Sequence, residues 1–227
     1  MTKIEKGSIK ELSLLTTTFW FWKSKKPAHD LIILLGTEPE LKRNQYVDLV
    51  LNFALELGAE RIYSVGGTYD RVPHTVEPII TAVVSNPSLK AEMRRYGVGL
   101  KDYEGPSSLH SLLIAQASRR NMRAVSLWGH APHYIQVPNA KVCYCMLTKL
   151  SKMLDIDLDL EDVKKAGEYL DEQVNKAIKQ KAELRDYVRR LEQEWSEGRY
   201  GAGEPIADNI IKEVENFLKE KRKEQPL

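Results

Sequence analysis

Cysteine is scarce in this chain of 227 residues, which has two, and no apolar run approaches the roughly 18 residues that a membrane-spanning helix needs. Cys143 and Cys145 stand two positions apart in a predicted helix, so they point in different directions and cannot easily share a disulfide or a metal ion. We expect both to be buried, reduced thiols. We expect a cytoplasmic protein, because the first residues also lack the apolar stretch of a secretory signal.

An excess of charge of either sign is lacking as well. Lys and Arg total 34, Asp and Glu total 32, and the net charge is +2. Because a nucleic-acid-binding protein usually presents a strongly basic face, we expect no nucleic-acid partner, and we expect no membrane partner either. The length suffices for one α/β domain with a modest appendage or for two small domains, and the apolar residues, 42% of the chain, can supply a core.

The common catalytic motifs are missing too. The chain has no G-x-S-x-G nucleophile elbow, no G-x-G-x-x-G fingerprint, no P-loop and no H-E-x-x-H zinc motif. We therefore expect neither a cofactor nor a metal ion.

Apolar runs and amphipathic stretches alternate through the first two thirds of the chain. Strands are predicted at 14–23, 31–36, 61–67, 81–85 and 124–129. Helices are predicted at 41–57, 87–96 and 107–121, and a further helix opens at 137–139. This alternation predicts a three-layer α/β/α domain over residues 1–155, with a mainly parallel sheet and an edge strand at 14–23.

The pattern of apolar residues changes after residue 155, from alternating strands and helices to heptads. A C-terminal helical appendage of residues 156–227 is therefore predicted. From Val163 onward, eight of ten heptad positions are apolar, which predicts one helix of roughly thirty residues. A Gly-rich break at 196–205 and a final helix from about Ile206 complete a predicted antiparallel helical hairpin. Its apolar seam either packs on its own domain or contacts another subunit.

Glycine-containing loops follow three of the predicted strands. Because the carboxyl ends of parallel strands meet at one edge of a sheet, we expect these loops to form one binding crevice for a ligand or partner. The candidate residues are Gly36, Thr37, Glu38, Gly66, Gly67, Tyr69, His74, Ser107, Ser108, His130, His133 and Tyr134.

The histidines and serines of this set allow several interpretations. The histidines are structural, or they act in acid–base chemistry through His74 or His133, or they bind a metal, although their spacing argues against the last. Ser107 or Ser108 caps the helix that follows, or binds an anion at its N-terminus together with Gly67.

Three stretches of the sequence carry a resemblance to a known family. The strings "DLIILLGTEPEL", "VGGTYDRVPHT" and "EGPSSLHSLLIAQASRRNMRAVSLWGHAPHYI" are similar to the proteasome assembly chaperone family of the second-chaperone type, over roughly residues 19–178. The resemblance implies an α/β/α fold like that of nucleoside phosphorylases, a homo-oligomer with three copies favoured, and in some members the chaperoning of proteasome α-subunits.

Two departures from the family pattern stand out. The chain has almost nothing in place of a first βα unit before Phe19, which would leave a strand edge for a partner chain to cover. It also ends in "KEQPL", without the hydrophobic-Tyr-any tail of several proteasome activators.

Two functions follow from these observations. The first is a non-enzymatic homo-oligomeric scaffold or chaperone that binds protein partners, with proteasome α-subunits among them. The alternative is a hydrolase- or phosphorylase-type enzyme that uses the strand-end crevice on a small molecule such as a nucleoside, with His74 or His133 as the acid–base group.

Overall fold

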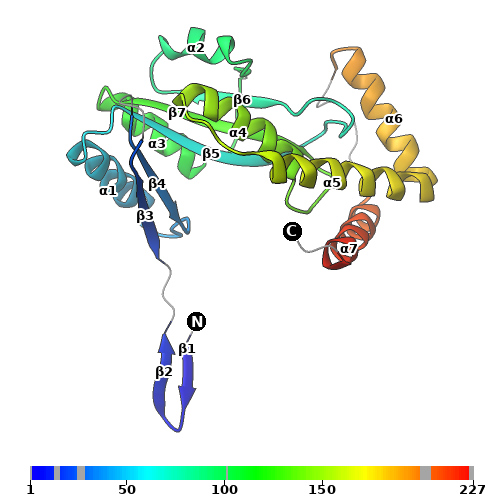
Figure 1. The fold of residues 1–227 in the computed structure, drawn as a ribbon, viewed down its shortest axis with the longest axis horizontal. Helices are drawn as coiled ribbons and strands as arrows, with labels where there is room; N and C mark the ends of the chain where they lie inside the picture. Colours follow the sequence, from blue (N-terminus) through cyan, green and yellow to red (C-terminus); the bar gives the residue numbers. More distant parts are fainter. Residues whose placement is uncertain (1, 13–15, 25–28, 101, 200–205, 225–227) are drawn as a thin grey trace.

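A computed structural model describes residues 2–12, 16–24, 29–100, 102–199 and 206–224. Within these residues the chain is a mixed α/β protein with an extended N-terminal hairpin at one end and a group of helices at the other (Figure 1). The predicted α/β class is thereby confirmed. None of the described helices is both long enough and apolar enough to cross a membrane.

The central sheet has three strands. They are β5 (Arg61–Asp70), β6 (Ile80–Val84) and β7 (Arg123–Pro132), in the order β5-β7-β6. β7 runs parallel to β5 and antiparallel to β6, so the sheet is mixed rather than mainly parallel. Ala124, Val125 and Leu127 of the middle strand are fully buried, as expected for a strand covered on both faces.

Helices cover the two faces of this sheet. α1 (Arg43–Glu56) and α3 (Leu109–Arg119) enclose one cluster with Ala124, whereas α2 (Leu89–Arg95) and α4 (Ala140–Leu154) enclose a second with Val125 and Leu127. Because successive side chains of β7 point to opposite faces of the sheet, the same strand contributes residues to both clusters. The predicted stops of α1 and α2 are confirmed by positive φ angles of 69° at Gly58 and 65° at Gly97.

Four strands precede α1 and form two separate hairpins. β1 (Thr2–Glu5) pairs with β2 (Ser8–Leu12), and β3 (Thr17–Trp22) pairs with β4 (Leu31–Gly36). The predicted strands at 14–23 and 31–36 are found from residue 17 onward, but the prediction that 31–36 joins the central sheet is wrong. No described strand bridges β4 to the free edge of β5, so each hairpin stands as a two-stranded sheet.

The C-terminal part contains α5 (Glu161–Gln180), α6 (Ala182–Ser196) and α7 (Asp208–Glu224). The prediction of one helix of about thirty residues is wrong, because Lys181 is extended, with φ −127° and ψ 110°. Lysine occupies a seam position there, and burying its ammonium would be costly. The break instead lets Lys181 pair with Glu213 of α7.

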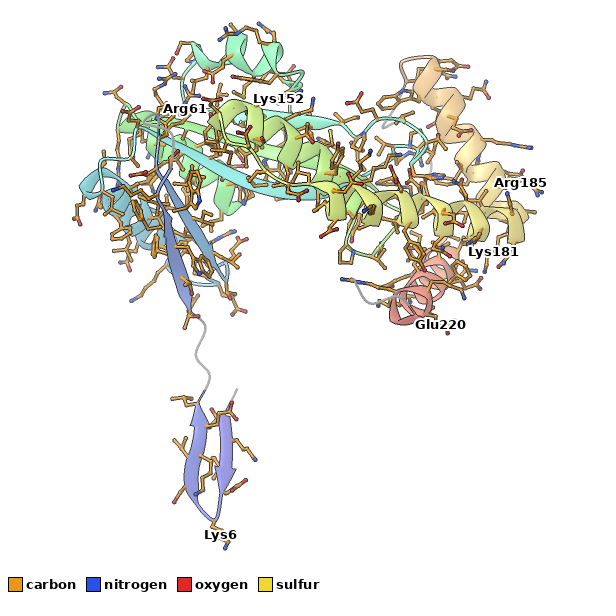
Figure 2. All side chains as sticks on the ribbon, in the orientation of Figure 1. Lys6, Arg61, Lys152, Lys181, Arg185 and Glu220 are labelled. Atoms are coloured by element: carbon orange, nitrogen blue, oxygen red, sulfur yellow. The ribbon has the colours of Figure 1, made fainter. Side chains whose placement is uncertain are left out.

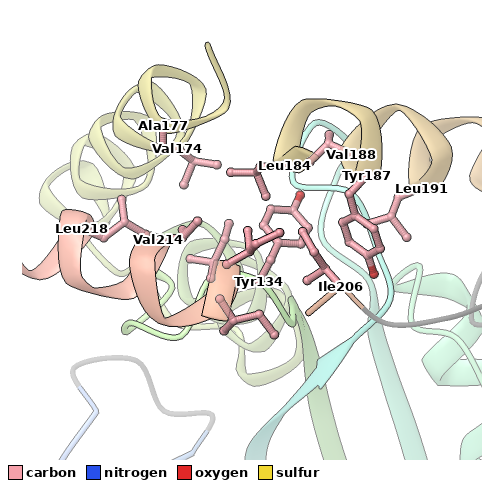
Figure 3. Close-up of a cluster of buried hydrophobic side chains, with 13 residues drawn as sticks. Tyr134, Val174, Ala177, Leu184, Tyr187, Val188, Leu191, Ile206, Val214 and Leu218 are labelled. Carbon is pink, nitrogen blue, oxygen red and sulfur yellow. The ribbon is translucent and has the colours of Figure 1, made fainter. Parts of the chain in front are cut away.

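The apolar side chains at the predicted heptad positions are nevertheless largely buried. Val174, Leu184 and Leu191 are at most 1% exposed and pack around Tyr134, next to β7 (Figure 3). The seam therefore contacts its own chain. α7 packs mainly against α5 rather than forming the expected hairpin with α6.

The prediction for the two cysteines is confirmed in part, and several other predictions concern residues that the structure does not describe. Cys145 is buried as expected, but Cys143 is exposed, because it points away from the sheet on α4. Residues 13–15, the turn around Pro27, positions 200–205 of the Gly-rich break and residues 225–227 of the tail lie outside the described residues.

Candidate functional site

The carboxyl ends of β5 and β7 form the rim of the central sheet. The two parallel strands are in register from Arg61 and Arg123 to Asp70 and Pro132. The predicted glycine loops start later than expected, because Gly66, Gly67 and Tyr69 continue β5 and Gly129 and His130 continue β7.

Close packing between β7 and α4 explains why position 129 is a glycine. A Cβ atom at Gly129 would lie 2.5 Å from Cγ1 of Val142, so α4 can approach β7 only over a residue without a side chain.

The rim brings together four of the predicted site residues, namely His74, His130, His133 and Tyr134. Gly36, Thr37 and Glu38 do not join them. They follow β4 in the separate two-stranded sheet, so the prediction of a common rim that includes Gly36 is wrong. Ser107 and Ser108 precede α3, where Ser108 accepts a hydrogen bond from Ser111 N at 3.1 Å and thus caps the helix.

His130 joins all three strands of the central sheet. Its Nδ1 lies 2.9 Å from Oδ2 of Asp70 on β5, and its Nε2 lies 2.8 Å from Oγ1 of Thr81 on β6. The side chain is almost fully buried. Both ring nitrogens therefore have partners within the sheet.

His133 begins a chain of hydrogen bonds that leads to α6. Its Nδ1 lies 3.3 Å from the carbonyl oxygen of Asp70, so it donates there, and its Nε2 accepts from the hydroxyl of Tyr187 at 2.9 Å. Arg71 donates to the same hydroxyl at 3.1 Å and pairs with Glu194 at 3.1 Å. The rim is thereby connected to a helix more than 100 residues away in the sequence.

His74 makes the corresponding connection to α5. Its backbone N–H donates to the hydroxyl of Tyr134 at 2.8 Å, and that hydroxyl lies 2.8 Å from His74 Nδ1. The other ring nitrogen lies 3.2 Å from Oδ1 of Asn175, which can only accept. Nε2 therefore carries the proton and Nδ1 accepts from the tyrosine. Burial raises the pKa of Tyr134, which keeps this hydroxyl protonated.

A partly buried cation completes the rim. The ammonium of Lys141 donates to the carbonyl oxygen of His74 at 2.5 Å and to Oδ2 of Asp171 at 2.6 Å. The cavity lined by these residues and His130 has a volume of about 10 Å³, the space of a single water molecule. Over the part of the chain that the structure describes, no group of three His, Cys, Asp or Glu side chains is placed to hold a metal ion.

Sequence reasoning found the histidines of the rim and Tyr134, the partner of His74, but missed the other partners. Asp70 lies three positions after the predicted strand 61–67 and is the last residue of the observed β5, so it could have been noticed as a carboxylate near a strand end. Arg71 and Tyr187 are 116 positions apart, and nothing in the local sequence indicates that they meet.

The buried histidines make stability depend on pH. Burial lowers the pKa of His74, His110 and His133 below the ordinary value of 6.5. The unfolded chain therefore binds more protons than the folded chain in mild acid, and the free energy of unfolding should fall as the pH drops through about 6.5. Above that pH the contribution is fully present.

Urea unfolding between about pH 7.5 and 5 measures this slope. His74→Asn should make it shallower, because it removes one of the groups that gain a proton on unfolding. An unfolding free energy that stays constant over this range would contradict the proposed linkage.

Comparisons with known proteins place these features in context. A family model described as the PAC2 family matches residues 1–178, a range that includes the N-terminal hairpin. No curated protein matches the chain. A PAC2 family protein from Streptomyces avermitilis is similar in structure with a TM-score of 0.70 and 27% identity, over 83% of this chain and 78% of that one.

Two further solved structures share the fold. A proteasome-assembly chaperone homologue from Mycobacterium tuberculosis has a TM-score of 0.71 and 22% identity, over 83% of this chain and 79% of its own. An archaeal proteasome activator from Pyrococcus furiosus, PbaB, has a TM-score of 0.61 and 24% identity, over 78% of this chain and 76% of its own.

Proposed function

The chain belongs to the PAC2 family, and we propose that it is a chaperone-like, non-enzymatic, homo-oligomeric scaffold that binds protein partners in the cytoplasm. Proteasome α-subunits are the first partners to test. This choice rests on two proteins of the same fold, one described as a proteasome-assembly chaperone homologue and the other as a proteasome activator.

The observation that carries the proposal is how fully the rim is occupied by its own side chains. A general acid or base must reach a bound substrate, yet each ring nitrogen of His74, His130 and His133 already has a partner within the chain. A cavity of about 10 Å³ is also far below the roughly 300 Å³ of a small-molecule site. Both points favour a binding protein over a phosphorylase or hydrolase acting on a nucleoside.

Tyr69 is the best candidate for contact with a partner. Among the predicted crevice residues it is the exposed aromatic side chain, with 53% of its surface accessible near the end of β5, whereas Tyr134 is buried. Exposed tyrosine is a common anchor in protein interfaces.

Co-expression with proteasome α-subunits from the same organism, followed by size-exclusion chromatography, tests the proposal. We expect co-elution of the wild-type chain, and an affinity about tenfold lower for Tyr69→Ala because an aromatic anchor is lost. Tyr103→Ala is the matched control, since Tyr103 is 74% exposed and lies outside the rim. Failure of any α-subunit to co-elute with the wild-type chain would remove the proteasome from the proposal.

A further inference from the structure

The hairpin of β1 and β2, called the arm below, is not covered by any other residue that the structure describes. All of its described residues are exposed. The register pairs Ile4 with Ile9 and Thr2 with Leu12, so the three apolar side chains share one face. They are 63%, 64% and 55% exposed.

An isolated two-stranded hairpin is at best marginally stable in water. The opposite face of the arm is polar, and there Lys3 pairs with Glu5 at 2.9 Å. Figure 2 shows the arm extending away from the body of the protein, with Lys6 at its tip. The arm thus has the amphipathic pattern of a sheet that packs on another surface, and none of the described residues supplies that surface.

A second uncovered apolar surface lies on the β3–β4 sheet. One face of this sheet packs on α1, because the rings of Phe19 and Phe53 are 4.6 Å apart and Thr17 Oγ1 lies 3.3 Å from the hydroxyl of Tyr46. Side chains alternate along the strands, so the intervening residues and their cross-strand partners point the other way. This outer face carries Thr18 and Leu31 and four well exposed apolar side chains, those of Trp20, Trp22, Ile33 and Leu35, which are 47%, 43%, 51% and 67% exposed.

We propose that the arm of one copy covers the outer face of a second copy, reciprocally, in a twofold dimer. The inference rests on the homo-oligomer of the proposed function and names its contact. Both surfaces are apolar and free of charge, as the centre of a stable interface usually is. Their seven side chains expose on the order of 800 Å² in each pairing, and two pairings give about 1,600 Å², the size of a standard specific interface.

A second copy is the occupant that the geometry favours. Each chain carries both halves of the contact, so a reciprocal exchange leaves neither half uncovered. In Figure 1 the arm continues beyond the end of the β3–β4 sheet instead of lying on it, and thus points toward space that another molecule can occupy. Folding back of the arm onto its own outer face is the competing arrangement, and the experiments below separate the two.

Light scattering on the full chain provides the first test. We expect a mass twice the 26.0 kDa of the chain. Ile4→Asp combined with Ile9→Asp, and separately Leu35→Asp, should give monomers, because each places a charge in the proposed apolar contact. Lys3→Thr, on the polar face of the arm, should leave the dimer intact. Circular dichroism checks that the variants keep their helices.

The outcomes separate this inference from the proposed function. A monomeric wild-type chain would overturn both. A trimer, or a dimer that survives the changes in the arm, would overturn the arm exchange and leave the homo-oligomer standing.

Cross-linking tests which chain supplies the arm. Two variants are made in a Cys143→Ser background, one with Ile9→Cys and the other with Ile33→Cys. The two proteins are mixed under conditions that allow subunit exchange and are then treated with a short bismaleimide. We expect a covalent product that joins the two different chains, and much less of it when Glu11→Cys replaces Ile9→Cys. A chain carrying both cysteines that cross-links only within itself would show that the arm folds back, and would overturn the exchange.

Discussion

Gly167→Leu is expected to lower the free energy of unfolding by about 3 kcal/mol, because it forces side-chain atoms into a closely packed contact between α5 and α4. A Cβ atom at Gly167 would lie 3.0 Å from both Cα and N of Lys141. These are backbone atoms at the start of α4, so they cannot move aside as the end of a flexible side chain could. The two helices would have to separate.

Two related variants make this prediction specific. Glu168→Leu introduces the same side chain at the next position of α5, which is exposed, and should change the unfolding free energy by less than about 0.5 kcal/mol. Gly167→Ala adds only the Cβ atom at these 3.0 Å contacts, and a gain of about 1 kcal/mol in helix propensity offsets part of the strain, so its loss should be smaller than that of Gly167→Leu. Urea unfolding measures all three. Equal stabilities of Gly167→Leu and Glu168→Leu would show that the close approach is unimportant.

Tyr187→Ala should cost about 3–5 kcal/mol, which is typical of removing a large aromatic side chain from a core. Tyr187 is 1% exposed and lies in the cluster of Figure 3. Its ring meets those of His133 and Tyr134 edge to face, with centroids 5.4 Å and 6.2 Å away. The truncation would open a cavity where α6 meets the rim.

Tyr187→Phe shows how much of this loss of unfolding free energy comes from the ring and how much from the hydroxyl group. The ring is kept, but His133 loses the donor to Nε2 and Arg71 loses one acceptor, so a loss of about 1–2 kcal/mol is expected. Tyr103→Ala, at an exposed tyrosine, is the control and should be nearly neutral. Thermal or urea unfolding gives the ranking. A phenylalanine variant as unstable as the alanine variant would assign the whole effect to the hydroxyl and contradict the packing argument.

Local patterns predicted the helices well. The apolar spacing of α1, α2 and α3 depends on neighbours three and four positions away, and their ends are marked by Gly58, Gly97 and Ser108. The arm was missed although a signal for it exists. The signal is Gly7 at the second turn position, because in the structure Lys6 and Gly7 have φ angles of 49° and 76°, as in the tight two-residue turns that join hairpin strands and favour glycine.

Strand order and direction could not be predicted in the same way. The apolar run of β6 predicts a strand, but not that its neighbour β7 runs the opposite way. The heptads likewise located the buried side chains of α5 and α6, but not the extended Lys181 between them. At the rim, the histidines were recognisable by type, whereas Asp70 and Tyr187 became partners only through contacts between distant segments.

The uneven distribution of covered surface limits how the protein can assemble. At the C-terminal end, Val174, Leu184 and Leu191 are already enclosed by their own chain. The arm and the outer face lie together at the opposite end of the molecule (Figure 1). A reciprocal exchange between two copies covers the arm and the outer face of both, so no patch is left for a further copy, whereas a head-to-tail exchange would leave one of each exposed at the ends of the assembly. This architecture therefore favours small closed assemblies and works against open-ended polymerisation.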